Sequence, residues 1–200
     1  MSYTKQLKET MQKEYKGTKD EDYNYREVYK QKLIDFRKQK ESVIRIDKPS
    51  NLSRARTLGY KAKKGIFVVR ARVRKGSGAY KRPVRGRRPK RMGVSKLTRK
   101  ISIQGIAEQR TARKYPNCEI LNSYWVAEDG KNEFYEIIVV EVNAPETKSD
   151  KELKKIIKAP KNRALRGLTS SQKKSRGLSK KGKGAEKARP SRRANKRKSH

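Results

Sequence analysis

The chain has 200 residues, the length of one domain, and a formal net charge of +37, because 57 Lys and Arg face only 20 Asp and Glu. Only 32% of the residues are hydrophobic, so the charge favours a small folded core carrying basic segments over one large core. No apolar run approaches the roughly 18 residues that span a bilayer, and the first residues lack a hydrophobic signal region. The single cysteine, Cys118, excludes an intrachain disulfide, and we expect a cytoplasmic protein.

The positive charge lies in two blocks. The first basic block, residues 48–107, holds 20 Lys or Arg and no acid, and the second, residues 161–200, holds 16 basic residues and one acid. Residues 1–47 and 108–160 are nearly balanced. A merely soluble surface would intersperse both signs. The segregation therefore indicates a nucleic-acid partner, because phosphates favour clustered cations through counterion release.

Two amphipathic helices are predicted at the N-terminus, over residues 2–16 and from about residue 22 to 38, with Gly17 as the stop of the first. Each carries an apolar stripe at helical spacing, which predicts packing on a core or on each other. The stripes are Tyr3, Leu7, Met11 and Tyr15 in the first helix, and Tyr25, Val28, Tyr29, Leu33 and Phe36 in the second.

A short strand over residues 42–46 and a helix of about two turns follow. Ser50 or Asn51 caps this helix, which ends before Gly59. Residues 65–74, GIFVVRARVR, form the clearest strand of the chain.

In that strand Phe67, Val69, Ala71 and Val73 point one way, while Arg70, Arg72 and Arg74 point the other. No acid lies nearby in the sequence to pair the arginines, so we expect them to contact phosphates; the alternative is a solvated edge face. Replacing all three with Gln is then expected to weaken RNA binding with little effect on folding.

Residues 75–95 have no periodicity, and their charge predicts a loop that lies against phosphate. Ser95 is predicted to cap a helix over residues 97–114, which Pro116 ends. The buried face of that helix includes Ile103, Ile106 and Ala107.

A hairpin follows, with strands over residues 118–127 and 133–142 and an Asp-Gly turn within residues 128–132. Packing is favoured over base stacking for Tyr124 and Trp125. The alternation places Ile120, Tyr124 and Val126 on one side and Leu121 and Trp125 on the other.

The segment Ser149–Glu152 has the pattern of a capping box and predicts a short helix that Pro160 closes. In the tail beyond it, Arg-Gly-Leu occurs at residues 166–168 and again at 176–178. Thr169 and Gln172 between the copies form a second capping box, for a helix over about residues 170–176 with Gly177 as its stop. At that length the helix is marginal alone, and we expect it to be ordered only with RNA around it.

These elements predict an α/β fold of the α+β type with a small, mostly antiparallel sheet in the chain order β-α-β-α-β-β. We expect three parts: an N-terminal helical segment (1–41), one α/β core (42–160) containing the basic loop 75–95, and a basic C-terminal extension (161–200).

Catalytic chemistry is missing from the sequence. His200 is the only histidine, so no Cys/His metal cluster and no Ser-His-acid or Cys-His arrangement can form. Glu128, Asp129 and Glu133 cluster at the hairpin turn, where a solvated turn is favoured over an acid/base pair. No phosphate-loop pattern occurs, and we expect no enzyme.

Three segments resemble one family: LGYKAKKGIFVVRARVRKG (58–76), LNSYWVAED (121–129) and RGLTSSQKKSRGL (166–178). They are similar to the archaeal and eukaryotic large-subunit ribosomal protein family called "fifteen-e", distinct from the bacterial protein of the same number, and closest in form to its archaeal branch. The resemblance is collinear over nearly the whole chain, except residues 17–24 and the extreme C-terminus.

The resemblance implies a structural component of the large ribosomal subunit in the cytoplasm, which binds 23S-type ribosomal RNA and neighbouring ribosomal proteins. It implies no catalysis, no membrane, no small-molecule substrate and no homo-oligomer. No cofactor or metal site is expected, apart from Mg²⁺ or K⁺ bound to the RNA. The rivals are a DNA-binding architectural chromatin protein, a basic enzyme acting on RNA, and a membrane-surface protein.

The expected RNA contacts are cations of the two basic blocks, mainly to phosphate and sugar. They are Arg54, Arg56, Lys61, Lys63, Lys64, Arg70, Arg72, Arg74, Lys75, Lys81, Arg82, Arg85, Arg87, Arg88, Lys90, Arg91, Lys161, Arg163, Arg166, Lys173, Lys174, Arg176, Lys180 and Lys181. Glycines expected to let the backbone turn or approach RNA are Gly59, Gly65, Gly167 and Gly177.

Overall fold

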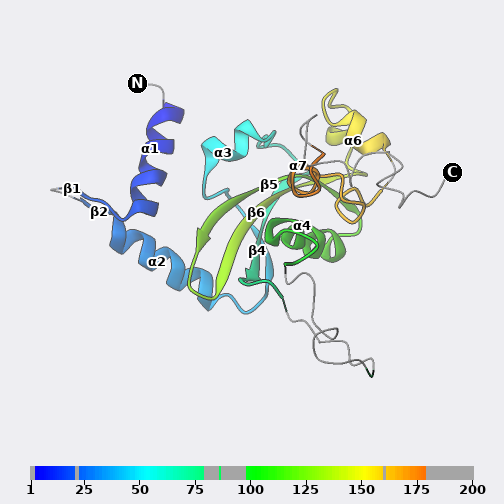
Figure 1. The fold of residues 1–200 in the computed structure, drawn as a ribbon. Helices are drawn as coiled ribbons and strands as arrows, with labels where there is room; N and C mark the ends of the chain where they lie inside the picture. Colours follow the sequence, from blue (N-terminus) through cyan, green and yellow to red (C-terminus); the bar gives the residue numbers. More distant parts are fainter. Residues whose placement is uncertain (1–2, 21–22, 79–85, 87–97, 160, 179–200) are drawn as a thin grey trace.

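A four-stranded antiparallel sheet with the order β3-β4-β6-β5 organises the computed structural model (Figure 1). Its strands are β3 (Val43–Ile46), β4 (Ile66–Arg74), β5 (Cys118–Glu128) and β6 (Asn132–Glu141). The structure describes residues 3–20, 23–78, 86, 98–159 and 161–178. The predicted α+β fold with an antiparallel sheet is confirmed, and no helix of these residues is long and apolar enough to cross a membrane.

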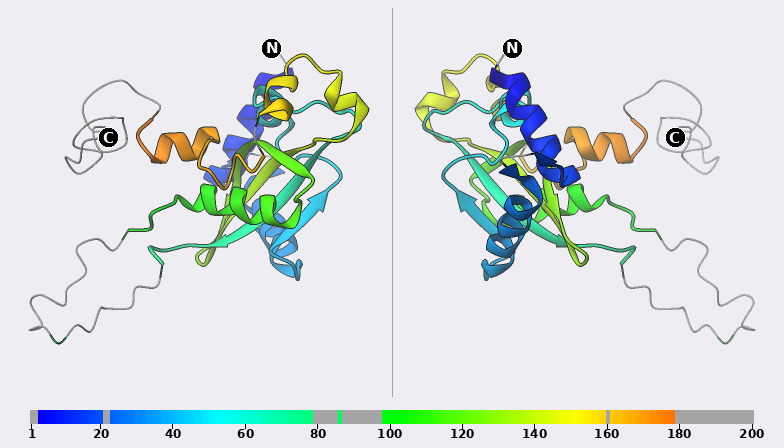
Figure 2. Two further views of the ribbon diagram at one scale, coloured as in Figure 1. Left: turned by 90° about the vertical axis from the view of Figure 1, so that its right-hand side faces the viewer. Right: turned by 90° about the vertical axis from the view of Figure 1, so that its left-hand side faces the viewer.

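Helices cover both faces of the sheet (Figure 2). Helix α4 (Ile103–Lys114) covers one face, while α2 (Tyr25–Lys38), α3 (Leu52–Thr57) and α6 (Lys154–Lys158) lie on the other. Strand β6 lies between β4 and β5 and is buried on both faces, which explains its run of β-branched residues.

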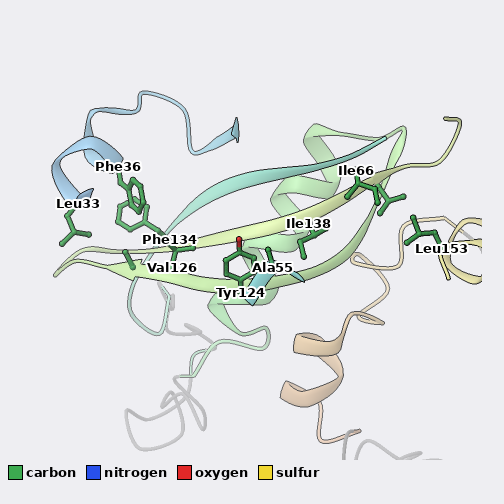
Figure 3. Packing of buried hydrophobic residues seen from close by; sticks show 11 residues of the cluster. Leu33, Phe36, Ala55, Ile66, Tyr124, Val126, Phe134, Ile138 and Leu153 are labelled. Atoms are coloured by element: carbon green, nitrogen blue, oxygen red, sulfur yellow. The ribbon is translucent and has the colours of Figure 1, made fainter. Parts of the chain in front are cut away.

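The core on the α2 side extends along the whole sheet. Figure 3 shows Leu33 and Phe36 of α2 beside Phe134 at one end, Ala55 of α3 near Tyr124, and Leu153 at the other end. Leu33 and Phe36 come from the expected N-terminal segment, and Ala164 of the expected C-terminal extension joins the opposite core beside α4. Packing therefore crosses both expected domain boundaries.

The N-terminal region holds α1 (Tyr3–Lys16) and a small hairpin that the sequence did not predict. The hairpin pairs β1 (Lys19–Asp20) with β2 (Tyr23–Asn24), so α2 begins at Tyr25 instead of about residue 22. Helix α1 lies against α2 and α3 but buries none of its residues completely.

Helix α4 is shorter than predicted, because Ser102 is its N-cap. The Ser102 hydroxyl accepts a hydrogen bond from the Gly105 N–H at 3.1 Å, and residues 98–101 are not helical. The predicted cap, Ser95, lies outside the described residues, as does most of the loop 75–95.

Two bulges in β5 overturn the alternation predicted for this strand. They fall between Ile120 and Asn122 and between Trp125 and Ala127 in the pairing with β6. As a result Ile120 packs on the α4 side together with Trp125, and Leu121 packs on the opposite side. A bulge adds one residue to a strand and so reverses the side on which later residues lie.

The capping box predicted at Ser149 is wrong. Ser149 instead follows a short helix, α5 (Pro145–Lys148), and its hydroxyl donates back to the Glu146 carbonyl at 3.0 Å. Helix α6 starts only at Lys154, without a side-chain cap.

The connection between α3 and β4 depends on Gly65, with φ of +80° and an added Cβ only 2.6 Å from Thr147 Cγ2. We predict that Gly65→Ala lowers the free energy of unfolding by about 2 kcal/mol or more, because backbone strain and a clash add together. Gly76→Ala is the control: its φ is +102°, but no atom of the described residues lies within 4 Å of the added Cβ. Urea unfolding measures both, and equal losses would contradict the packing role.

Candidate nucleic-acid interface

Arg70 is the clearest correction among the expected RNA contacts. Its guanidinium Nη2 lies 3.3 Å from Glu136 Oε1, and its side chain is only 11% exposed. The guanidinium also stacks over the Phe36 ring, 3.8 Å from the ring centroid. The inference that no acid pairs these arginines is wrong here, because the acid is far away in the sequence and adjacent across the sheet. We no longer propose Arg70 as a phosphate contact.

Glu136 is fully buried and is satisfied by neighbours on three elements. Tyr124 donates its hydroxyl to Oε2 at 2.5 Å, and Ser50 donates its N–H to Oε2 at 3.0 Å and its hydroxyl to Oε1 at 2.5 Å. Burial and the neighbouring carboxylate raise the pKa of Tyr124 far above its usual range. Tyr124 is buried in the core, as predicted, and its hydroxyl is hydrogen-bonded to Glu136 there.

Lys61 and Lys63 are paired with the segment that follows α5. Lys63 Nζ lies 2.5 Å from Asp150 Oδ2, and Lys61 Nζ lies 3.3 Å from the same oxygen and 2.8 Å from Glu152 Oε2. The hydrogen bond from Lys63 holds the pKa of Asp150 well below its usual range. These two lysines therefore fix the Gly59–Gly65 connection to α5 and α6.

The neighbouring glycines also serve protein packing. An added Cβ on Gly59 would lie 3.1 Å from Leu121 Cδ2, and one on Gly65 would meet Thr147. Protein side chains fill the space beside both glycines, which favours a packing role over the close approach of RNA that we expected there.

Arg163 belongs to the protein interior as well. It donates from Nη1 to the carbonyls of Ile120 at 3.0 Å and Leu121 at 3.2 Å, beside the bulge of β5. The N–H groups of Asn162 and Arg163 donate to the Glu119 carboxylate at 2.5 and 3.2 Å. Burial lowers the pKa of Arg163. These bonds fasten the start of the second basic block to β5.

A second buried carboxylate, Glu108 of α4, holds helix α7 (Ser170–Ser175) and the residue before it. Glu108 is 1% exposed. Its donors are Ser123 Oγ and Thr169 Oγ1, each at 2.5 Å, Ser171 Oγ at 2.7 Å and Gln172 Nε2 at 3.1 Å. The predicted position of this helix is confirmed, but Thr169 and Gln172 bond Glu108 in place of a capping box. These hydrogen bonds are contacts with protein, so we now expect α7 to be ordered without RNA.

The two Arg-Gly-Leu copies form the same structure. Gly167 and Gly177 both have φ of +71°. Leu168 N–H donates to the Arg163 carbonyl and Leu178 N–H to the Lys173 carbonyl, each at 2.9 Å. Both have the turn geometry with which helices commonly end, in which glycine takes the left-handed conformation. The first copy closes the turn of residues 163–167, and the second ends α7.

Four of the remaining expected RNA contacts have charged groups that bond to protein. Arg72 donates to the Lys40 carbonyl, Lys75 pairs with Glu128 at 3.4 Å, and Arg176 donates to the Gly167 carbonyl. Arg166 donates to the Lys161 carbonyl at 3.1 Å. Cations outside the described residues are Lys81, Arg82, Arg85, Arg87, Arg88, Lys90, Arg91, Lys180 and Lys181.

Seven expected cations are exposed, and their charged groups have no hydrogen-bond or ion-pair partner within the described ranges. They are Arg54, Arg56, Lys64, Arg74, Lys161, Lys173 and Lys174, which we call the free cations. Arg113, exposed in the last turn of α4, has the same character. The sequence analysis missed it because it lies in the balanced stretch. No group of three or more potential metal-ligating side chains occurs among the residues described.

Comparisons with known proteins identify the family of this chain. The Ribosomal L15e family model, described as Ribosomal L15, matches residues 6–195. The large ribosomal subunit protein eL15 of the archaeon Methanocella arvoryzae is 52% identical over 166 residues, covering 82% of this chain and 84% of the relative. Both place the chain in the class of ribosomal proteins, which are structural and not catalytic. It belongs to the Ribosomal L15e family, as the three sequence segments indicated.

We predict that Arg70→Gln lowers the free energy of unfolding by about 3 kcal/mol, because it leaves the buried Glu136 without its cation. Arg74→Gln, at the exposed end of the same strand, is expected to change it by less than about 0.5 kcal/mol. Urea unfolding of both variants tests this. Wild-type stability in Arg70→Gln would contradict the buried pair.

We also predict that Glu108→Gln destabilises the protein by about 2 kcal/mol, since one oxygen acceptor becomes an amide donor and cannot meet the hydroxyl and amide donors around it. Trypsin should then cleave faster after Lys173 and Lys174. Glu27→Gln, on the exposed side of α2, is the control. Unchanged cleavage and stability in Glu108→Gln would mean that Glu108 does not hold α7.

Proposed function

We propose that this chain is a structural constituent of the large ribosomal subunit and binds its 23S-type RNA through the free cations. The observation that carries the proposal is the division among the basic residues. The fold uses Arg70, Arg163, Lys61 and Lys63 internally, whereas the free cations pair with no carboxylate of the described residues. A polyanion outside the protein would supply the missing charge.

Two chemical properties suit these residues to RNA. Arginine binds phosphate through two parallel hydrogen bonds and stacks on bases, while lysine neutralises phosphate as a point charge. Such contacts fix the position of a protein on RNA without reading sequence, and selectivity then comes from RNA shape and from 2′-hydroxyl groups. The proposed role is therefore to hold RNA helices in place.

The same proposal covers the surroundings of the protein. The relative from Methanocella arvoryzae is named as a large-subunit protein, so neighbouring large-subunit proteins are the proposed protein partners. We propose that the chain acts in the ribosome, as one copy, and without a small-molecule substrate or cofactor of its own.

Sedimentation of a cell lysate through a sucrose gradient at moderate and high salt tests the assignment. We expect the protein to travel with the large subunit at moderate salt. Travel with DNA would instead favour the architectural chromatin alternative, and a position in the light fractions would contradict both.

A matched pair of double variants tests the division of cations. Lys173→Gln with Lys174→Gln should lower the magnitude of the slope of log affinity for RNA against log salt by about 1.4–1.8, because each lost phosphate contact removes about 0.7–0.9. Lys61→Gln with Lys63→Gln should change it less, since those lysines are already paired with Asp150 and Glu152. Equal slopes for the two variants would contradict the division.

A further inference from the structure

A groove of about 400 Å³ lies between α1, α3 and β5, within the size range of small-ligand sites, about 300–1,000 Å³. Helix α1 lies beside α3 there without burying any of its own residues fully. The lining residues are Lys8, Met11, Gln12, Tyr15, Asn51, Ser53, Arg54, Thr57 and Trp125. The α1 stripe that looked like a packing face is thus open along this groove.

Aromatic rings form part of the wall. The rings of Tyr15 and Trp125 meet edge to face, with centroids 4.8 Å apart and planes at 82°. This arrangement leaves ring surface for a flat partner, and Tyr15 is 52% exposed. Bases stack on such rings with little dependence on sequence, because every base has a π-face.

Unused polar groups line the same groove. The Gln12 amide and the Trp125 indole N–H make no hydrogen bond within the part of the chain that the structure describes. Asn51 uses its Oδ1 to cap α3, accepting from the Arg54 N–H at 2.9 Å, which leaves its amide N–H groups available. An amide that both donates and accepts suits the edge of an unpaired base.

Charge distinguishes the occupant. Two cations, Lys8 and Arg54, line the groove, and none of the described residues that line it is acidic. Arg54 is one of the free cations. A nucleotide offers a flat base to the aromatic rings and a phosphate to these cations, whereas an apolar protein segment would leave both cations unused.

We propose that this groove binds one unpaired RNA base, which stacks on the face of one ring of the Tyr15–Trp125 pair and meets the other ring edge to face, while its phosphate meets Arg54 or Lys8. The inference rests on the proposed function and adds to it a site for a single-stranded nucleotide. Elsewhere on the surface the proposed contacts are mainly to phosphate and sugar.

Trp125 is the only tryptophan of the chain and therefore reports directly on its own groove. The full-length protein is titrated with a short oligoadenylate and with an abasic ribose-phosphate oligomer of equal length, both dye-labelled. Anisotropy measures binding, and tryptophan emission measures stacking. We expect both oligomers to bind but only oligoadenylate to quench Trp125 saturably.

Variants assign the response to the groove. Tyr15→Ala should weaken the quenching titration about tenfold, and Gln12→Ala, which removes no hydrogen bond within the described chain, about fivefold. Tyr23→Ala, an equally exposed tyrosine on β2, is the matched control and should leave the titration unchanged.

Oligoadenylate binding with unchanged Trp125 emission, or equal quenching by the abasic oligomer, would overturn the base site and leave the proposed function intact. If neither oligomer binds and 23S-type RNA does not bind either, both the base site and the proposed function are contradicted. A Trp125 response to added large-subunit proteins but not to RNA would assign the groove to a protein segment and overturn the inference.

Discussion

The structure depends on where a strongly basic chain places its few acids. The carboxylates that hold distant segments together come largely from residues 108–160, the stretch between the two basic blocks. Glu136 pairs with Arg70 and Asp150 with Lys63, which fixes the first basic block. Glu119 and Glu108 bind the N–H and hydroxyl groups at the start of the second. Since a buried carboxylate must be satisfied, each of these acids determines how one basic segment leaves the core.

This arrangement explains how a chain with a net charge of +37 can keep a small core. Cations close to the sheet, such as Arg70 and Arg163, are neutralised or hydrogen-bonded by protein. Cations on the outer side of the covering elements, such as Lys173 and Lys174 of α7, are exposed. Self-repulsion is thereby moved to the surface, where phosphate can relieve it. The core orients the basic segments, and the exposed cations are the ones proposed to bind RNA.

Much of the fold could be predicted from the sequence because local signals agreed with tertiary packing. The helix stop at Gly177 and the Asp-Gly turn are local features, and the sequence indicated them. The predictions about Arg70 and about the alternation in β5 were wrong because they depend on pairing across the sheet. The acid beside Arg70 lies 66 positions away along the chain, and the bulges that reverse Ile120 and Leu121 are set by β6. The capping boxes failed because Glu152, Thr169 and Gln172 found other partners in the fold.

Hydrogen exchange of the free full-length protein, followed by mass spectrometry at moderate salt, tests the central claim most directly. The account predicts that amides of Leu168, Lys173 and Arg176, which are hydrogen-bonded within residues 161–178, exchange slowly before any RNA is added. Their protection should approach that of α4, which holds Glu108. Exchange at the rate of an unstructured chain, with protection appearing only on addition of RNA, would contradict the account.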